Sequence, residues 1–345
     1  MIDFLIVGQG IAGSVLALQL LQKGQRVLVI NNSARNQASS VAAGMYNPIT
    51  GKALIKTWLA DALFPYLKCF YRTMEQTLGT SFLHAIPIFR PFLSAEERKT
   101  WLSRATQAAY APFIQAIADA SYHQEHMRYH HGGLVLQQAG YLDVPHFLSA
   151  TCAYLRAREV YLEEDFTHKA VHLTNSSVKY GEIIARRLIF CEGPQAQQNP
   201  FFDQLSLSPV KGEWLSVALD QSLEVIYNRG VFVLPRPNAR AIVGATYHRK
   251  ELTLNPTERA RQDLEDKLKG TFRLSYRILN QQAGIRPATR DHRPLIGMHN
   301  QYPQVGIFNG LGTKGISLAP YFANAFVQHL LHGEPLPAEV IWSRR

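Results

Sequence analysis

Three glycines near the beginning of the chain have the spacing of a phosphate-binding turn. Gly8, Gly10 and Gly13 form the pattern G-x-G-x-x-G. In such a turn the first glycine permits a tight bend, the second lets the backbone approach a pyrophosphate, and the third lets a helix pack against the preceding strand. The free N–H groups at that helix N-terminus attract phosphate. The spacing therefore predicts dinucleotide binding by Gly8, Gly10, Ile11, Ala12 and Gly13.

The residues around these glycines supply the elements that the turn requires. Residues 3–7 are a short apolar run, which is typical of a buried parallel strand. Residues 14–23 carry apolar side chains at helical spacing and end at Gly24, and residues 26–30 form a second apolar run. The order strand, glycine turn, helix and strand is much more specific evidence for nucleotide binding than the motif alone.

Asn31 and Asn32 stand at the end of this second strand. An Asp or Glu usually occupies that position, where its carboxylate accepts hydrogen bonds from ribose hydroxyls. An amide oxygen can still accept one such bond, so we expect Asn31 to contact the ribose. The loss of the acid predicts weaker binding of the adenosine half.

A second glycine pattern stands near the end of the chain. Gly310, Gly312 and Gly315 follow the apolar run 304–308 and precede a helical stretch at residues 316–331. Lys314 does not stand between a Gly and a Ser or Thr, so this turn is not a P-loop. Two strand, glycine turn and helix units at opposite ends of the chain predict that both helix N-termini face one ligand.

Several intervening segments have a clear pattern. Residues 187–191 form a buried strand that ends near Gly193, which predicts a further parallel strand at the nucleotide site. Residues 284–297 gather charge, proline and glycine in a loop, where functional residues concentrate. We predict a helical cap at 55–70 and 94–121, a return to the nucleotide domain at 130–136 and 140–158, an antiparallel sheet at 209–217, 230–235 and 241–246, and a helix at 257–270.

Length and composition restrict the class of protein. The 345 residues are enough for about two domains. The 36 Lys and Arg residues exceed the 26 acidic residues and give a net charge of +10. This excess has two interpretations: a soluble surface that attracts small anionic substrates, or a nucleic-acid partner. The chain contains no signature of an RNA-binding module.

Cysteine usage and hydropathy add three expectations. Cys69, Cys152 and Cys191 are scattered and lack C-x-x-C spacing, so we expect neither a disulfide framework nor a metal site. No apolar run has the length of a membrane span, so no membrane association is predicted. The first strand begins almost at once and leaves no room for a signal peptide, which suggests a reducing, cytoplasmic setting. The oligomeric state is left open.

An ordered set of motifs resembles one enzyme family. The set resembles the D-amino-acid-oxidase and glycine-oxidase family of FAD-dependent amine oxidoreductases, and the similarity covers nearly the whole chain. It comprises the first glycine turn, the segment 39–44, residues 140–143, residues 284–297 and the second glycine turn, with Ala319 and Pro320 after it.

This resemblance implies a fold class, a cofactor and a reaction type. The fold would be α/β, with a discontinuous Rossmann-like FAD domain at residues 1–55, 140–205 and 280–345. Residues 56–139 and 206–279 would form a substrate domain of antiparallel sheet and helical cap. The cofactor would be FAD, and the reaction would oxidise a C–N bond next to a carboxylate in a small amino acid or amine.

The resemblance also implies roles for individual residues. Arg286 would pair bidentately with the substrate carboxylate, a role that suits the planar guanidinium. The alternative is that Arg286 forms a salt bridge with Asp291 or Glu213. Lys314 would favour negative charge near the flavin. The residues implied to lie along the flavin are Ser39, Ser40, Ala43, Gly44, Met45 and Gly193, and those at its polar edge are Gly310, Leu311, Gly312, Thr313, Lys314 and Gly315.

Two positions depart from the family pattern. Phe232 stands about where several members place a substrate-facing Tyr, and Glu192 replaces a small or hydroxyl residue. These departures predict that the substrate is not the commonest one of the family.

A closer local similarity gives a second candidate function. Residues 286–292 and 310–315 are similar to segments of the FAD-dependent half of a bacterial enzyme that removes a carboxymethyl group from a tRNA wobble uridine. The basic charge would suit a tRNA partner, although the chain lacks the methyltransferase half of that enzyme. A third hypothesis is a binding protein that has kept the flavin fold without the chemistry.

Overall fold

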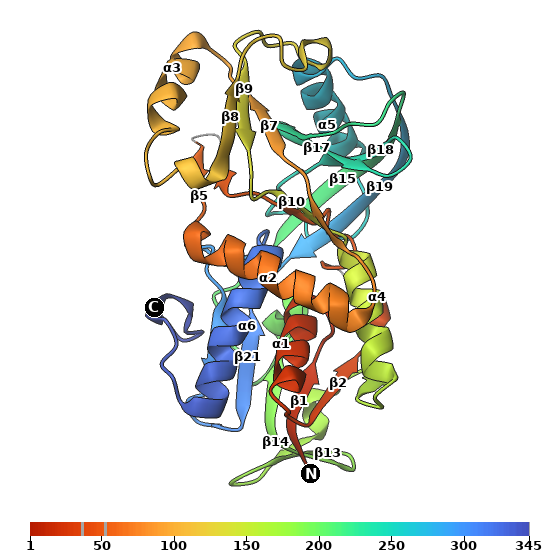
Figure 1. The fold of residues 1–345 in the computed structure, drawn as a ribbon. Coiled ribbons are helices and arrows are strands. Elements are labelled where there is room, and N and C mark those ends of the chain that lie inside the picture. Colours follow the sequence, from red (N-terminus) through yellow and green to blue (C-terminus); the bar gives the residue numbers. More distant parts are fainter. Residues whose placement is uncertain (36–37, 52–53, 345) are drawn as a thin grey trace.

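The computed structural model describes residues 1–35, 38–51 and 54–344 of the chain. Its α/β architecture contains two large sheets, with helix α2 (Ala60–Leu78) crossing between them (Figure 1). The sheet that contains the N-terminal strand lies at one end of the molecule and the sheet that carries α3 and α5 at the other.

The first sheet has a core of five parallel strands drawn from the beginning, middle and end of the chain. Their order is β11 (Tyr161–Glu163), β2 (Val27–Asn31), β1 (Ile2–Val7), β14 (Ile183–Phe190) and β21 (Val305–Asn309). Val7 lies opposite both Ile30 and Phe190. This register brings the carboxyl ends of the strands to one edge, where ligands bind in open α/β sheets.

Three helices cover this sheet and its neighbourhood: α1 (Ile11–Gln22), α4 (Val144–Arg156) and α6 (Gly315–His332). Helix α1 lies beside α6, and Gln19 donates to the carbonyl of Pro320 at 2.8 Å. Pro320 has no N–H, so the carbonyl four residues earlier loses its helical donor. That carbonyl, on Ile316, accepts instead from the Tyr71 hydroxyl at 3.2 Å, which fastens α2 to α6.

Antiparallel strands complete the first sheet. A hairpin of β12 (Val171–Leu173) and β13 (Val178–Tyr180) pairs with the first part of β14. Strand β20 (Leu295–Met298) pairs with β21.

The second large sheet has eight strands and is mostly antiparallel. Its order is β19 (Tyr276–Arg286), β15 (Val210–Leu219), β18 (Arg240–Gly244), β17 (Val231–Arg236), β16 (Ile226–Arg229), β7 (Ile88–Pro91), β9 (Gly133–Leu136) and β8 (Ile114–Ala118). Helix α5 (Glu258–Thr271) packs on β15. The antiparallel strands predicted within residues 209–246 are confirmed, with a single parallel pair between β16 and β7.

The predicted helical cap is only partly correct. Helix α3 (Ala95–Arg104) ends well before residue 121, and residues 114–118 form strand β8. Residues 133–136 form β9 and join the second sheet rather than returning to the first. Helix α2 begins at Ala60 rather than at residue 55. In residues 114–118, pairing with β9 replaced the helix suggested by local spacing, and residues 55–56 pair with β4 instead of starting α2.

Short strands connect the two large sheets. Strands β3 (Met45–Tyr46), β10 (Gly140–Leu142) and β6 (Leu83–Ala85) form one small sheet, and β4 (Ile49–Thr50) pairs with β5 (Ile55–Lys56).

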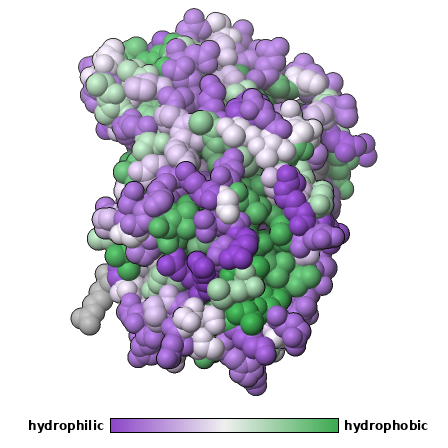
Figure 2. Space-filling view, turned by 60° about the horizontal axis from the view of Figure 1, so that its bottom comes forward, coloured by the Kyte–Doolittle hydropathy of each residue, from purple (hydrophilic) through white to green (hydrophobic). Residues whose placement is uncertain are grey.

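Hydrophilic residues cover much of the face shown in Figure 2, and hydrophobic residues gather over one part of it. Within the described residues, none of the helices combines the length and the apolar character that crossing a bilayer requires.

Candidate functional site

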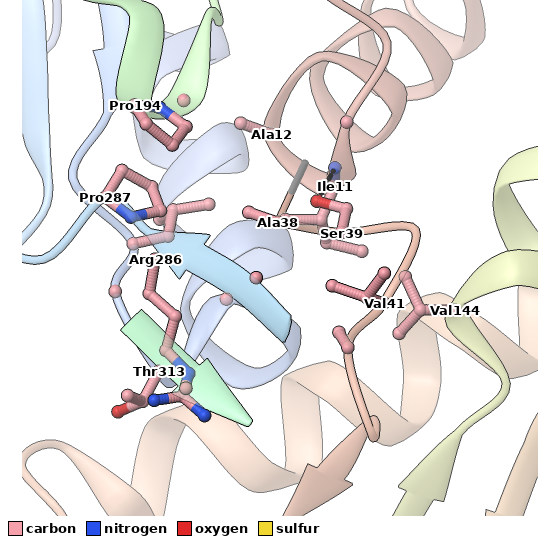
Figure 3. Close-up of a pocket in the computed structure, with 18 of the residues that line it drawn as sticks. Ile11, Ala12, Ala38, Ser39, Val41, Val144, Pro194, Arg286, Pro287 and Thr313 are labelled. Carbon is pink, nitrogen blue, oxygen red and sulfur yellow. Dashed lines mark hydrogen bonds between the residues drawn. The ribbon is translucent and has the colours of Figure 1, made fainter. Parts of the chain in front are cut away.

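A cavity of about 860 Å³ brings the two glycine turns together. Gly10 of the first turn and Gly312 of the second both line it. In Figure 3, Ile11 and Ser39 lie on one side of the cavity, and Pro287 and Arg286 lie on the other. The volume falls in the upper part of the range of ligand pockets, about 300–1,000 Å³. The structure therefore has room for one large ligand between the two turns.

The glycines of the first turn are required by close backbone contacts. A β-carbon at Gly8, where φ is +97°, would lie 2.5 Å from the carbonyl oxygen of Cys191. A β-carbon at Gly13 would lie 1.8 Å from the carbonyl oxygen of Gly8. Gly13 does not line the cavity, so its contribution is to let α1 approach β1. Gly10 does line it, and its missing side chain leaves the entrance to α1 open.

The N-terminus of α1 points its positive end at the cavity. Ile11 and Ala12 line the wall, and the first turn contains no acidic residue. The Ile11 N–H donates to the Ser39 hydroxyl at 3.1 Å, and this bond fixes the segment that contains Ser39 against the helix. This arrangement suits an anionic group such as a pyrophosphate.

Asn31 and Asn32 also line the cavity, at the carboxyl end of β2. The Asn31 Oδ1 accepts from the backbone N–H of Gln9 at 2.9 Å, and its Nδ2 donates to the Tyr161 hydroxyl at 3.2 Å. The Asn32 Nδ2 donates to Asp165 at 2.8 Å. Contact with a ribose remains a prediction for Asn31.

Residues 38–45 form a backbone wall of the cavity. Ser39, Ala43, Gly44 and Met45 line it, whereas Ser40 is exposed and does not. A β-carbon at Gly44 would lie 2.0 Å from the Leu142 carbonyl oxygen, so this segment lies directly on β10.

The second sheet holds this wall in place through two long side chains. The Trp214 indole Nε1 donates to the carbonyl of Val41, and Arg236 donates to the carbonyl of Ala43, each at 2.7 Å. The Arg236 guanidinium also stacks on Tyr141 at 3.8 Å. Sequence reasoning did not identify the two hydrogen bonds, because each joins residues more than 170 positions apart.

The second glycine turn forms the opposite wall. Leu311, Gly312, Thr313, Lys314 and Gly315 line the cavity, and Gly310 packs behind them. Asn309 links this turn to the turn after β14. Its Oδ1 accepts from the Gly310 N–H at 2.8 Å, and its Nδ2 donates to the carbonyl of Gly193 at 2.9 Å. Gly193 also lines the cavity.

Lys314 places a positive charge at the N-terminus of α6. Its Nζ lies 3.3 Å from the Thr57 hydroxyl. Burial lowers the pKa of Lys314, and the nearby positive charge of Arg293 lowers it further. Arg293 in turn stacks on Trp58 at 3.7 Å.

Arg286 ends strand β19 on the cavity wall. Its Nη1 donates to the carbonyl of Thr246 at 3.3 Å. No ion pair found within residues 1–35, 38–51 and 54–344 includes Arg286. Burial lowers the pKa of its guanidinium. A buried cation usually has an anionic partner, so the position is suited to an anionic ligand.

The alternative interpretation of Arg286 as a structural brace is not supported by its contacts. Asp291 pairs instead with Arg344 at 2.8 Å. Burial alone would raise the pKa of Asp291, but hydrogen bonds from Arg344, Arg293 and Thr289, together with the charge of Arg344, outweigh it and lower the pKa to about 2. Glu213 pairs with Lys211 at 3.4 Å.

Aromatic side chains line the same cavity as the guanidinium. They are Phe232, Trp214 and Tyr247. A β-carbon at Gly212 would lie 2.0 Å from the Arg286 Nη2, so the guanidinium occupies the space beside this glycine. Phe232 was predicted to face the substrate, whereas Trp214, Tyr247 and Gly212 carried no recognisable motif.

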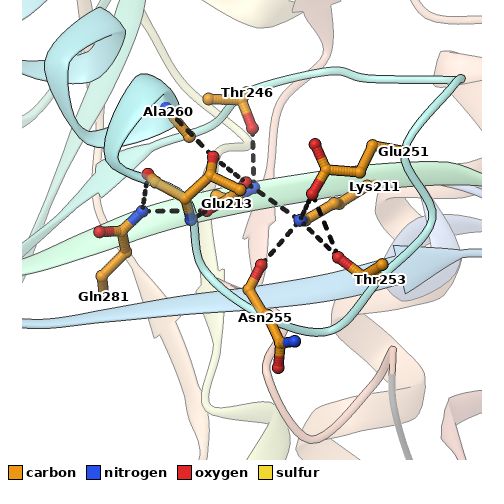
Figure 4. A network of polar contacts seen from close by, with 9 residues as sticks. Lys211, Glu213, Thr246, Glu251, Thr253, Asn255, Ala260 and Gln281 are labelled. Atoms are coloured by element: carbon orange, nitrogen blue, oxygen red, sulfur yellow. Dashed lines mark hydrogen bonds and ion pairs between the residues drawn. The ribbon is translucent and has the colours of Figure 1, made fainter.

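A buried polar network surrounds Lys211 and Glu213 (Figure 4), on the strand whose Val210 pairs with Arg286. The Lys211 side chain is 1% exposed, and its Nζ donates to Glu251 at 3.1 Å, to Thr253 at 3.1 Å and to the carbonyl of Asn255 at 2.7 Å. Glu213 accepts from the backbone N–H of Thr257 at 2.8 Å. These bonds fix the segment that carries Thr246, which binds Arg286.

The wall formed by the end of β14 contains a hydrogen-bonded acid. Glu192 accepts from Asn199 at 2.7 Å and lies 2.8 Å from the His168 Nε2. Cys191 also lines the cavity, and burial raises the pKa of its thiol. The thiol is therefore neutral and is a poor nucleophile.

A group of metal-compatible side chains lies outside the cavity. Atoms of His123, Glu125 and His126 that could ligate a metal lie within 4.8 Å of one another. Both ring nitrogens of His126 already contact protein partners, Tyr227 and Gln221. Sequence reasoning did not single out this group.

Comparison with known proteins supports this description. MnmC of Shewanella amazonensis, a tRNA 5-methylaminomethyl-2-thiouridine biosynthesis bifunctional protein, is 24% identical over 379 residues, covering 95% of this chain and 56% of the relative. The chain thus spans about half the length of this relative. Solved structures of glycine oxidase from Bacillus cereus and iminodiacetate oxidase from Chelativorans sp. share the fold. Their TM-scores are 0.80 and 0.77, at 18% and 20% identity. The alignments cover 100% and 98% of this chain, and 99% and 98% of the solved chains.

A family-wide comparison matches residues 3–329 to the family described as FAD dependent oxidoreductase, abbreviated DAO. The match includes both glycine turns and Arg286. The chain therefore belongs to the DAO family of FAD-dependent oxidoreductases, and its cofactor is FAD.

Proposed function

We propose that this enzyme oxidises the C–N bond of a small amino acid or N-substituted amino acid. The observation that carries the proposal is the Arg286 guanidinium, which lies on the wall of a cavity that Phe232 and Trp214 also line and forms no ion pair within the described residues. A carboxylate is the ligand that best matches this planar fork of donors.

The residues of the cavity fit FAD. The bare backbone at Gly8 and Gly10 and the N-terminus of α1 would hold the pyrophosphate. The N-terminus of α6 lies at the opposite glycine turn and would face the polar edge of the flavin. The residues that would hold FAD are Gly8, Gly10, Ile11, Ala12, Asn31, Asn32, Ser39, Ala43, Gly44, Met45, Gly193, Leu311, Gly312, Thr313, Lys314 and Gly315.

The bound flavin supplies a two-electron acceptor for a hydride equivalent. Arg286 would bind the substrate carboxylate through two parallel hydrogen bonds and thereby orient the neighbouring carbon. Phe232 and Trp214 would exclude water from that carbon. Lys314 would favour negative charge at the polar edge of the flavin. No side chain has to act as a base if the substrate amine is neutral.

Water is the one further reactant that this oxidation needs. The carbon between nitrogen and carboxylate would lose hydrogen with its electron pair, which FAD would accept, while the nitrogen lone pair forms the C=N bond. The N–H proton leaves to solvent. Water then adds to the imine and releases an amine and an oxo acid.

The structural neighbours suggest a narrower substrate class. Glycine and iminodiacetate, after which these two oxidases are named, both contain a nitrogen bonded to CH₂–COO⁻. We therefore propose an N–CH₂–COO⁻ unit as the group that Arg286 binds. Phe232 in place of a tyrosine removes a hydroxyl and leaves more apolar surface for the substituent on nitrogen.

A second candidate is removal of a carboxymethyl group from a modified tRNA uridine. It is favoured by the MnmC relatives and by the net charge of +10. The same oxidation of N–CH₂–COO⁻ would release this group as glyoxylate. A protein with the flavin fold and no catalytic activity is the third candidate.

Anaerobic bleaching of the flavin near about 450 nm tests these candidates directly. Glycine, sarcosine, iminodiacetate, D-amino acids, proline and tRNA carrying carboxymethylaminomethyl uridine would be compared. Reduction by a small amino acid supports the main proposal, and reduction by the tRNA alone would replace it with the RNA reaction. If a flavin-loaded protein is reduced by none of these compounds, the proposed substrate class is refuted.

A further inference from the structure

The ribose contact expected of Asn31 is limited by the bonds that this side chain already makes. A backbone N–H can only donate, so the Asn31 Oδ1 must face Gln9, at 2.9 Å. The Nδ2 faces the Tyr161 hydroxyl at 3.2 Å and cannot accept a hydrogen bond. Asn31 is 5% exposed. At most one lone pair of its oxygen is left for a ribose, whereas a ribose carries two hydroxyls.

A carboxylate stands on the neighbouring strand at the same edge of the sheet. Strand β11 runs parallel to β2, with Glu163 opposite Asn31. Both strands end at the cavity, and Asp165 follows two residues after this pair. Asp165 lines the cavity beside Asn32, whose Nδ2 donates to the Asp165 Oδ1 at 2.8 Å. This bond holds the Asp165 carboxylate next to the end of β2.

The two preceding carboxylates are directed to other partners. Glu163 accepts from the Ser33 N–H at 2.7 Å and from the Tyr161 hydroxyl at 2.9 Å, and it does not line the cavity. Glu164 lines the cavity, but its Oε1 accepts from the Tyr180 hydroxyl at 2.9 Å. Asp165 also has partners in the protein, and it is the one of these three acids that both lines the cavity and is bonded to Asn32 at the end of β2. By this position it is the acid best placed to receive a group bound there.

We propose that Asp165 accepts a hydrogen bond from the adenosine ribose of FAD and takes over the role of the acid that β2 lacks. The proposal concerns retention of the cofactor and is independent of which amine is oxidised. A hydrogen bond to a charged acceptor is about twice as strong as a neutral one. We expect its loss to weaken FAD binding about ten- to a hundred-fold.

The test follows release of flavin from the full-length holoenzyme. On dilution, Asp165→Asn should release FAD at about ten- to a hundred-fold higher protein concentration than the wild type, seen as a rise in flavin fluorescence. Glu164→Gln is the matched control, because it removes the same charge from the adjacent, cavity-lining residue. Its FAD affinity should stay within about threefold of the wild type.

Displacement of the flavin by ADP and its deoxy analogues identifies the ligand group. In the wild type, either 2′-deoxy-ADP or 3′-deoxy-ADP should displace FAD less well than ADP, and Asp165→Asn should abolish this difference. If the wild type does not distinguish the three nucleotides, the proposal is refuted, even if the variant fails to fold. It is also refuted if Asp165→Asn retains FAD normally. The same holds if the loss of affinity caused by Asp165→Asn adds to the loss caused by removing the ribose hydroxyl.

Discussion

Replacement of Arg286 separates a carboxylate clamp from a structural brace. A guanidinium has five N–H donors, and the protein uses one of them in the 3.3 Å bond to the Thr246 carbonyl. Two parallel donors therefore remain for a carboxylate. Losing a buried, hydrogen-bonded charge pair costs about 2–5 kcal/mol. We expect Arg286→Ala to lower kcat/KM about thirty-fold to several thousand-fold, with flavin content unchanged.

Two further variants sharpen the test. Arg286→Lys should recover only part of the activity, because a point charge cannot form the planar pair of bonds. Arg290→Ala removes the same charge from an exposed residue of the same loop and should leave kcat/KM within about twofold. The assay is anaerobic reduction of the flavin over a range of substrate concentrations, with thermal unfolding measured in parallel. Normal turnover per bound flavin in Arg286→Ala, together with lower stability, would show that the clamp is wrongly assigned.

Three other substitutions test separate parts of the structure. Gly212→Ala would push the Arg286 guanidinium aside, because the new β-carbon would lie 2.0 Å from Nη2. We expect kcat/KM to fall about a hundred-fold while FAD is retained. An unchanged kcat/KM would show that the guanidinium can move freely. Gly13→Ala should abolish flavin retention, because its β-carbon would lie 1.8 Å from a backbone oxygen. The control Gly270→Ala in α5 meets no atom within 4 Å and should change the free energy of unfolding by no more than about 1 kcal/mol. Thermal unfolding and the amount of bound flavin measure both effects. The pKa of Asp291 is lowered to about 2, so its carboxylate stabilises the fold above the unfolded-state pKa near 3.9 and loses this contribution as pH falls towards 2. Asp291→Asn should therefore reduce the pH dependence of the free energy of unfolding in that interval. An unchanged acid unfolding profile would exclude this ion pair as a source of stability.

The two glycine turns were predictable from sequence because their backbone geometry admits almost no other residue. The close approaches at Gly8 and Gly13 leave no space for a β-carbon, so glycine is required at both positions and its spacing is visible in the sequence. The parallel strands were predictable for a similar reason, since short apolar runs stand directly beside these turns. Arg286 was identified only through its resemblance to a family motif. The roles assigned to the cavity residues remain predictions.

Other features depend on contacts that no local pattern encodes. Strand β8 lies in a segment with helical spacing, and its pairing with β9 decided its structure. The bonds from Trp214 and Arg236 to the wall of the cavity join distant parts of the chain. The bonds that occupy Asn31 likewise depend on Tyr161, 130 residues away. Long-range packing of this kind is not visible in one sequence.

The buried ammonium of Lys211 has a consequence for motion near the substrate. Separation of residues 246–257 from β15 would break the bonds of this ammonium to Glu251, Thr253 and Asn255, and would leave Glu213 as its partner. The N–H groups of Thr246 and His248 are bonded to the carbonyls of Glu213 and Lys211. In hydrogen exchange, these two amides should therefore open together with the strand beneath them, and not with the faster fluctuations of a surface loop.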